Sequence, residues 1–309
     1  MNFYDRDIVS IRDFSKKEIE SVLDLSEKMI PYARGEKVAR PLDGRILGNL
    51  FFEPSTRTRL SFESAAHRLG ANVIDVSQMS MTSISKGETL ADTIRMVDTY
   101  CDVIVLRHPH EGAARLAAKF SENPVINAGD GAGSHPTQTL LDLFTIRRAK
   151  KKIEGLNIVL VGDLKYGRTV HSLTDALAEF GANLTLVAPD TLQMPSDNIR
   201  HLKGKDCNPI MTKKLDDVIK DADVLYVTRI QKERFPDPAE YNKVSGTYRI
   251  NNEMLREAKK DLIVMHPLPR IDEIDAEVDS TEHAKYFEQA FNGTPVRMAL
   301  LNLILGGKL

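Results

Sequence analysis

The sequence predicts an α/β protein with two domains, each a parallel sheet flanked by helices. Its 309 residues suffice for about two ordinary domains, each able to bury its own core. Short apolar, β-branched runs alternate with longer amphipathic segments, and strand followed by helix, repeated, is typical of a parallel sheet. The polar run RRAKKKIEG at 147–155 interrupts this alternation, so we place the domain boundary between 147 and 148.

Four strands are expected in the first domain, after an opening helix at about 16–32. The apolar runs place these strands at 46–52, 73–76, 103–106 and 125–127. Helical periodicity places the helices that separate them at about 57–69, 88–99, 112–121 and 136–150.

The second domain restarts the same alternation. Its strands are expected at 156–161, 184–187, 224–228 and 262–265, with helices near 168–180, 212–220 and 251–260. An amphipathic segment at about 284–304 closes the chain. We expect this C-terminal helix to return to the first domain, so that 291–309 complete 1–147 and the second domain spans 148–290.

Composition excludes several classes of protein. Lys and Arg number 42 against 44 Asp and Glu, which removes the electrostatic reason to expect a nucleic-acid partner. Cys101 and Cys207 alone cannot build a disulfide framework or a four-thiolate zinc site. The N-terminal stretch is charged throughout, and no apolar run approaches about 20 residues. We therefore expect a cytoplasmic protein with no membrane or nucleic-acid partner.

The sequence gives no support for a nucleotide or a metal. The phosphate loop GxxxxGK[ST] is absent, and GDGAGSH at 129–135 does not fit GxGxxG between a strand and a helix. His108 and His110 would lie on the same side of an extended segment, but no third ligand is nearby. We expect neither a metal nor a cofactor.

An anion site is predicted after the first strand, in the run FFEPSTRTRLSFESAAHRLG. Pro54 stops the strand, Ser55 is a natural N-cap, and Gly70 ends the helix that follows. Hydroxyls, free backbone N–H groups and Arg57 crowd together at 55–58, at the positive end of that helix. With Arg59 in the same turn, phosphate binding is favoured over an ordinary capped helix with surface arginines.

Two further strand ends deliver polar groups to the same edge of the first sheet. Arg107 follows the third strand, and the loop after the fourth strand leads to HPTQT, which carries His135 and Gln138. Ligands of open parallel sheets bind at the carboxyl ends of the strands. The convergence of three strand ends favours a binding site over isolated structural residues.

The second domain presents groups suited to a dicarboxylate. Arg168 follows the strand 156–161, and Arg229 and Gln231 follow 224–228. Two guanidinium groups from separate strands can each grip one carboxylate bidentately. Leu268 and Pro269 lie in a loop after 262–265, where prolines give rigid, exposed carbonyls. The alternative is that the two arginines pair with Glu53 or Glu233.

Seven motifs together resemble the catalytic chain of the aspartate carbamoyltransferase family over nearly the whole length: STRTR, KGETLADT, RHPHEGAARLA, HPTQTLLDL, GDLKYGRTVHSL, TRIQKER and HPLPRIDEI. The resemblance implies transfer of a carbamoyl group from carbamoyl phosphate to the amino group of L-aspartate. The products would be N-carbamoyl-L-aspartate and phosphate, in de novo pyrimidine biosynthesis. It makes 1–147, with 291–309, the carbamoyl phosphate-binding domain and 148–290 the aspartate-binding domain.

The resemblance also implies roles for individual residues. The groups that would bind carbamoyl phosphate are Ser55, Thr56, Arg57, Thr58, Arg107, His135 and Gln138. Among them, Thr58, Arg107 and His135 would polarise the carbamoyl oxygen, and Gln138 would meet the carbamoyl NH2. The groups that would bind aspartate are Lys86, Arg168, Arg229, Gln231, Leu268 and Pro269. The catalytic set is Arg57, Thr58, Lys86, Arg107 and His135.

Assembly and motion are further implications of the resemblance. The family forms homotrimers with shared sites, so Lys86, with Thr82 or Ser83 beside it, would reach the phosphate site of the adjacent chain. Family trimers often join separate zinc-bearing regulatory chains that make the enzyme allosteric. The domains are expected to close on aspartate, with 230–246 as a mobile loop. Glu53 would then pair with Arg168 and Arg234.

Two alternatives differ in function. Ornithine carbamoyltransferase would share STRTR and HPTQ but would need acidic and amide groups for a side-chain ammonium, with HCLP near the C-terminus. Arg168, Arg229 and Pro267 in HPLP favour aspartate instead. A non-catalytic anion-binding relative would be expected to have lost part of the cationic set, and that set is complete here.

Overall fold

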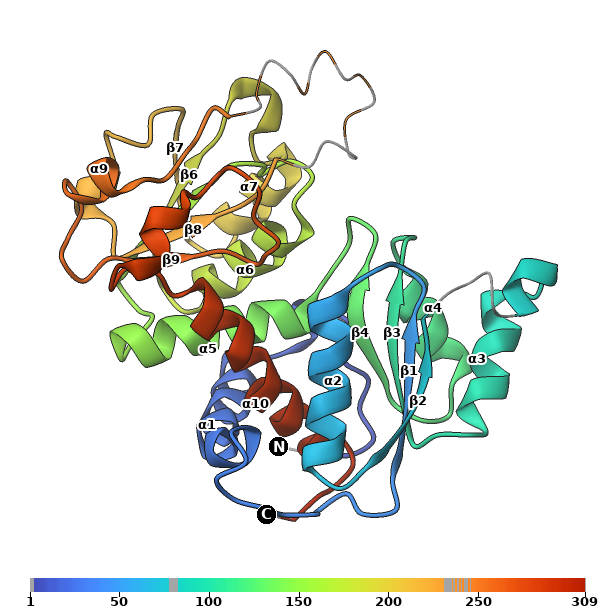
Figure 1. Ribbon diagram of the computed structural model, residues 1–309. Helices are drawn as coiled ribbons and strands as arrows, with labels where there is room; N and C mark the ends of the chain where they lie inside the picture. Colours follow the sequence, from blue (N-terminus) through green and yellow to red (C-terminus); the bar gives the residue numbers. More distant parts are fainter. Residues whose placement is uncertain are drawn as a thin grey trace. The chain divides into compact units, whose positions relative to one another are not determined.

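The computed structural model describes residues 3–77, 83–230, 235, 237, 239, 241, 244 and 246–308. The chain divides into two compact units, which are treated separately: unit 1 is Met1–Phe144 with Phe291–Leu309, and unit 2 is Thr145–Ala290. Each unit contains one parallel sheet flanked by helices (Figure 1). The predicted fold class is confirmed. Within the described residues, no helix has the length and hydropathy needed to span a bilayer.

Unit 1 is built on a four-stranded sheet in the order β2-β1-β3-β4. The strands are β1 (Ile46–Phe51), β2 (Asn72–Val76), β3 (Val103–His108) and β4 (Val125–Asp130), and every pairing is parallel. All residues of β3 and β4 are buried. Strand β3 lies inside the sheet, and β4 is the last strand of the order, where Ile8 bridges to Ile126. Such continuous buried runs are strong sequence signals, which explains why β3 and β4 were predicted at nearly these positions.

Helices cover both faces of the first sheet. They are α1 (Lys16–Ala33), α2 (Thr56–Arg68), α3 (Leu90–Asp98), α4 (Ala113–Phe120) and α5 (Pro136–Lys150), with 3-10 turns η1 (Ile11–Asp13) and η3 (Ser83–Lys86). Ile94 of α3 and Ala117 of α4 pack against Leu50, Ile104 and Leu106 in one apolar cluster. In Figure 1, α2 and the red C-terminal helix lie on the opposite side of the sheet from α3 and α4.

Two helices continue through the division between the units. The predicted joint at 147–155 begins inside α5, which runs on to Lys150, while the units divide between Phe144 and Thr145. The C-terminal helix α10 (Tyr286–Ile304) starts in unit 2 and ends in unit 1. There the Asp5 N–H donates to the Ile304 carbonyl at 3.0 Å. The returning C-terminal helix was predicted correctly.

Unit 2 holds a five-stranded parallel sheet in the order β7-β6-β5-β8-β9. Its strands are β5 (Asn157–Val161), β6 (Asn183–Val187), β7 (Ile210–Thr212), β8 (Val224–Val227) and β9 (Ile263–Met265). Its helices are α6 (Arg168–Glu179), α7 (Ser196–Lys203) and α9 (Asn252–Leu255), with 3-10 turns η4 (Asp190–Leu192), η5 (Ile219–Asp221) and η7 (Ala276–Ser280).

The prediction for this unit needs correction at four points. The helix predicted at 212–220 is wrong, because that stretch holds the end of β7, a turn and η5. Leu215 and Ile219 have helical spacing, but both reach the core from this irregular segment. The helix predicted at 251–260 shrinks to α9. The sequence also missed β7, a short edge strand whose Ile210 and Met211 are exposed and so give no buried run, and missed α7.

Candidate active site

The strands of unit 1 bring the predicted anion-binding groups to one edge. Phe51 of β1 lies opposite Arg107 of β3, and the Phe52 N–H donates to the Arg107 carbonyl at 2.8 Å. His108 of β3 in turn lies opposite Asp130 of β4. Because all four strands are parallel, the starts of α2 and α5 lie at this same edge.

Helix α2 begins with its cap hydroxyl unused. Ser55 is the N-cap residue in extended conformation, yet its side chain makes no capping hydrogen bond. The first N–H groups of a helix have no acceptor within the helix, so they are available to an anion at this end. Thr58 is buried and Thr56 exposed, which places one hydroxyl inside the unit and one at its surface. This end of α2 is open to an anion, and its role as the phosphate site stays a prediction.

The two arginines of STRTR differ in their partners. Arg59 pairs with Asp75 of β2 at 2.9 Å, and Asp75 also accepts a hydrogen bond from the buried Asn49 amide at 2.9 Å. Arg57 is exposed, and no carboxylate among the described residues lies within ion-pair distance of it. Arg59 is therefore a structural residue, and Arg57 is the arginine left for a ligand.

Arg107 is held rigidly at the end of β3. Its side chain is buried, one guanidinium nitrogen donates to the Ala128 carbonyl at 3.1 Å, and another donates to Glu53 at 2.9 Å. These bonds fix the orientation of the cation before any substrate arrives. Such preorganised charge is what stabilises a developing oxyanion.

The loop that carries His135 is folded around Asp130. The two carboxylate oxygens of Asp130 accept hydrogen bonds from Asn127 and from the N–H groups of Ser134 and Gly112, at 2.9 to 3.0 Å. Gly131 has φ of +50°, and a Cβ there would lie 2.7 Å from the Glu111 nitrogen. The glycines of GDGAGSH therefore allow a tight turn that delivers His135 to the start of α5.

His135 immediately precedes α5 and Gln138 lies in the first turn of this helix, and both are buried. The Gln138 amide nitrogen donates to Asp142 at 2.9 Å, one turn further along the helix. This bond fixes the amide so that its oxygen is the group left to accept a hydrogen bond from a ligand. That polarity matches the predicted contact with a carbamoyl NH2.

Sequence reasoning missed a buried arginine behind this edge. Arg297 of α10 is 3% exposed and donates to Ser61 of α2 at 2.9 Å and to Thr137 of α5 at 3.3 Å. Its guanidinium lies 5.0 Å from the centre of the Phe62 ring. Burial lowers the pKa of Arg297 to about 9, against the opposing effect of the Asp142 charge and with a smaller lowering by Arg107. A single arginine in an amphipathic helix resembles a surface residue, so the sequence contained no signal for it.

The structure places Lys86 apart from the other predicted groups of unit 1, and it places His108 and His110 in contact with each other. Lys86 ends η3 and is exposed, and no contact within the described part of unit 1 joins it to Arg57 or Arg107. Thr82 lies outside the described residues, so the choice between Thr82 and Ser83 stays open. The His108 Nδ1 accepts the His110 N–H at 3.0 Å, and burial lowers the pKa of His108. Among the described residues, no three His, Cys, Asp or Glu side chains are grouped as for a metal.

The carboxyl ends of β5 and β8 meet at the predicted dicarboxylate site in unit 2. Gly162 follows β5 with φ of +118°, and a Cβ at this position would overlap the Thr228 carbonyl oxygen. This close approach requires glycine. Asp163 then accepts the Lys165 and Tyr166 N–H groups at 3.1 and 2.9 Å, which turns the chain into α6.

Arg168 is the first residue of α6, and Arg229 follows Thr228 after β8. Both arginines are half-buried. Gln231, Glu233 and Arg234 lie outside the described residues, as does most of the predicted mobile loop. Their predicted roles stay predictions, and so does the expected pairing of Glu53 in the closed state.

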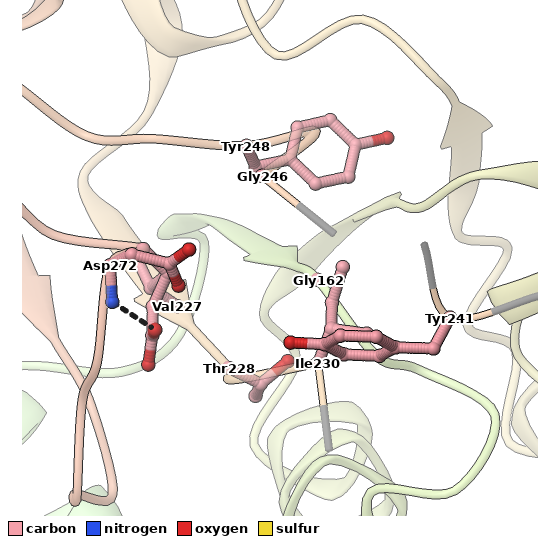
Figure 2. A pocket seen from close by; sticks show the side chains of 9 residues that line it. Gly162, Val227, Thr228, Ile230, Tyr241, Gly246, Tyr248 and Asp272 are labelled. Carbon is pink, nitrogen blue, oxygen red and sulfur yellow. Dashed lines mark hydrogen bonds between the residues drawn. The ribbon is translucent and has the colours of Figure 1, made fainter. Parts of the chain in front are cut away.

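Leu268 and Pro269 lie in the loop after β9. Leu268 has φ of +56°, an unusual backbone conformation for a non-glycine residue, and its N–H donates to the His266 Nδ1 at 2.8 Å. A hollow of about 20 Å³ lies near this loop, with room for one water molecule. Its lining includes Gly162, Thr228, Tyr241, Tyr248 and Asp272 (Figure 2).

Two family models match most of the chain. The model described as aspartate/ornithine carbamoyltransferase, carbamoyl-P binding domain, matches residues 6–148. The model described as aspartate/ornithine carbamoyltransferase, Asp/Orn binding domain, matches residues 154–304.

Individual proteins match over almost their full length. The aspartate carbamoyltransferase catalytic subunit of Methanocella arvoryzae is 58% identical over 307 residues, covering 99% of each chain. That of Thermococcus gammatolerans is 59% identical over 306 residues, again covering 99% of each.

Solved structures agree with these matches. The catalytic subunit of M. jannaschii aspartate transcarbamoylase has a TM-score of 0.90 and 53% identity, covering 96% of this chain and 97% of the other. Aspartate transcarbamoylase from Trypanosoma cruzi, in complex with carbamoyl phosphate and aspartate, has a TM-score of 0.93 and 42% identity, covering 98% of each chain. With two domain models matched in sequence and relatives this similar from end to end, the chain belongs to the aspartate carbamoyltransferase catalytic subunit family.

Proposed function

We propose that the chain transfers the carbamoyl group of carbamoyl phosphate to the amino group of L-aspartate, giving N-carbamoyl-L-aspartate and phosphate in de novo pyrimidine biosynthesis. The observation that carries this proposal is the edge of unit 1, where the start of α2, Arg57, the held Arg107 and the buried His135 gather. The solved relative from T. cruzi, which is in complex with both substrates, supports the same reaction.

Unit 1 supplies the groups that bind and polarise carbamoyl phosphate. The phosphate dianion occupies the start of α2, where Ser55, Thr56 and Arg57 surround it. Thr58, Arg107 and His135 point their donors at the carbamoyl oxygen, on which negative charge grows as the tetrahedral centre forms. Gln138 accepts a hydrogen bond from the carbamoyl NH2. Fixed donors of this kind lower the barrier without a covalent intermediate.

The reaction needs no nucleophile from the protein. The aspartate nitrogen attacks the carbamoyl carbon and forms the new C–N bond, and the C–O bond to phosphate then breaks. The leaving phosphate takes the electron pair of that bond and accepts the proton from the nitrogen. The protein holds the reacting atoms together and stabilises the charge.

Unit 2 selects the acceptor. Arg168 and Arg229 each bind one carboxylate of aspartate, Gln231 assists, and the Leu268 carbonyl with Pro269 meets the amino group. Ornithine carries an ammonium group at the end of its side chain, which two guanidinium groups repel. Charge therefore favours aspartate.

The proposed assembly is a cytoplasmic homotrimer in which Lys86 completes the site of an adjacent chain. A separate zinc-bearing regulatory chain would confer control by nucleotides, because neither the cysteines for that zinc nor a nucleotide motif is present in this sequence. Nucleotides should then leave the purified catalytic chain unaffected. Nucleotide sensitivity of that chain alone would contradict this part of the proposal.

One assay separates the candidate activities. The purified chain is incubated with carbamoyl phosphate and either L-aspartate or L-ornithine, and the ureido products are separated by chromatography. Carbamoyl-aspartate alone is the expected product. Citrulline would indicate the ornithine enzyme, and the absence of either product despite measurable carbamoyl phosphate binding would indicate a non-catalytic relative.

A further inference from the structure

A buried histidine and glutamate lie directly behind the Leu268 loop. His266 follows β9, and its Nε2 lies 2.7 Å from Oε1 of Glu273, with side chains 1% and 8% exposed. The His266 Nδ1 accepts the Leu268 N–H at 2.8 Å. A ring nitrogen that accepts a hydrogen bond carries no proton, so the proton of this imidazole is on Nε2 and is donated to Glu273.

Glu273 holds the far end of the same loop. Its Oε2 accepts the N–H groups of Ile271 and Asp272 at 3.1 and 3.2 Å, and the second of these bonds is drawn in Figure 2. Burial raises the pKa of Glu273, but the hydrogen bond from His266 and the backbone donors outweigh it, and the net shift is downward. The carboxylate is thus held in its charged form, the form that accepts all three bonds.

The two side chains replace the backbone pairing that a helix or strand would provide. Three N–H groups of the segment 268–272 end on His266 or Glu273. The His266 N–H itself donates to the Gln289 side chain at 2.8 Å, which ties the start of the loop to α10. The loop is therefore closed by side-chain contacts at both ends.

The backbone conformation of Leu268 depends on the hydrogen bonds made by His266 and Glu273. Its φ of +56° is unfavourable for a residue with a Cβ, and such conformations persist only where surrounding contacts fix them. The Leu268 N–H donates to His266. In the proposed function, the carbonyl of this same residue binds the substrate. Rotating that residue into a relaxed conformation would turn the carbonyl away.

We propose that His266 and Glu273 form a positioning pair that aims the Leu268 carbonyl at the amino group of the acceptor substrate. This inference rests on the proposed function, in which Leu268 binds aspartate. Aspartate at neutral pH has no hydrogen-bond donor except its amino group, so a backbone carbonyl can bind only there. The pair would thereby set the orientation of the attacking nitrogen without touching it.

Two substitutions at His266 separate its two bonds. In His266→Gln the amide nitrogen can still reach Glu273, but no acceptor remains for the Leu268 N–H. In His266→Asn the side-chain oxygen can take the place of Nδ1, but contact with Glu273 is lost. His283→Gln is the matched control: it is a half-buried histidine in the same unit whose Nδ1 lies 2.8 Å from the Leu262 carbonyl, before β9.

The readout compares aspartate with succinate, which has both carboxylates but no amino group. His266→Gln should raise the KM for aspartate roughly 10-fold, the effect of one charge-assisted hydrogen bond. Inhibition by succinate and binding of carbamoyl phosphate should change less than about 2-fold by the same reasoning. His266→Asn should lie between His266→Gln and the wild type, and His283→Gln should match the wild type.

Three outcomes would overturn the inference. Equal weakening of aspartate and succinate would mean that the pair only maintains the fold of unit 2, and unchanged aspartate kinetics in His266→Gln would remove it from the site. An effect of His283→Gln equal to that of His266→Gln would also count against it. If His266→Gln does not fold, Glu273→Gln decides, because its single oxygen cannot serve both His266 and the backbone. A wild-type chain that makes no carbamoyl-aspartate would instead defeat the proposed function.

Discussion

The two candidate half-sites are held by different means. In unit 1, buried side chains fix one another: Arg107 binds Glu53 and the Ala128 carbonyl, and Gln138 binds Asp142. In unit 2 the backbone itself is shaped, by Gly162 at φ of +118° and Leu268 at φ of +56°. The difference fits the proposed roles. Stabilising a developing charge requires fixed cations, whereas orienting an amino group requires a fixed carbonyl.

The largest expected effect comes from removing the fixed cation of unit 1. Arg107→Ala should lower kcat about 1,000-fold, since the loss of one oxyanion donor costs on the order of 3 kcal/mol in barrier. Steady-state kinetics with both substrates varied would measure it. Arg115→Ala, which removes an exposed arginine of α4 in the same unit, should leave kcat unchanged. A similar loss in both variants would mean that the general charge of the unit matters and not the fixed position of Arg107.

The second prediction asks whether the unit 1 half-site is complete within one chain. Lys86→Ala and Arg57→Ala should each be nearly inactive, and trimers reassembled from an equal mixture should regain activity. If Lys86 acts across an interface, roughly a quarter of the interfaces in such a mixture join an intact Lys86 to an intact Arg57. The control is each variant reassembled with itself. Mixed trimers as inactive as both parents would place Lys86 in the site of its own chain or outside it.

A third prediction tests whether the two half-sites are independent. Arg229→Ala should raise the KM for aspartate roughly 10- to 100-fold, the effect of losing a charged hydrogen-bond donor, and should lower turnover. Binding of carbamoyl phosphate, measured by calorimetry, should be nearly unchanged, because its ligands lie in unit 1. Normal aspartate kinetics would remove Arg229 from the site.

The sequence predicted most of the fold because its central strands are fully buried. The runs that became β3 and β5 are apolar almost throughout, and strand ends in a parallel sheet locate the ligand edge at once. Prediction failed at the exposed edge strand β7, which is only three residues long, whereas the equally exposed edge strand β2 was found from its β-branched residues Val73, Ile74 and Val76. It also failed at 212–220, where Leu215 and Ile219 have the spacing of a helix but reach the core from a turn and a short 3-10 segment. Periodicity cannot distinguish such a segment from a helix.

The residues of the candidate site also divide into those that the sequence could predict and those that it could not. Arg107 lies at the end of β3, and Arg57 and His135 lie in the segments that follow β1 and β4, so their position in the chain indicates their position in the fold. Arg297 and the His266–Glu273 pair act through tertiary contacts, which no local pattern encodes. The sequence analysis assigned Arg57 to the phosphate and counted Arg59 as a second arginine in the same turn, and the structure adds that Asp75 pairs with Arg59.

The smallest expected effect sharpens this contrast between the two arginines of α2. Arg59→Gln removes an ion pair with Asp75 whose side chains are 31% and 26% exposed, so it should cost at most about 1 kcal/mol of stability. Thermal unfolding would measure that loss, and calorimetry should show carbamoyl phosphate binding within about 2-fold of the wild type. The matched variant Arg57→Gln should do the opposite, with unchanged unfolding and binding weakened roughly 10- to 100-fold, because only its guanidinium is open to the phosphate. Equal loss of binding in both variants would mean that Arg59 leaves Asp75 to bind the ligand, and the division of roles between the two arginines would be wrong.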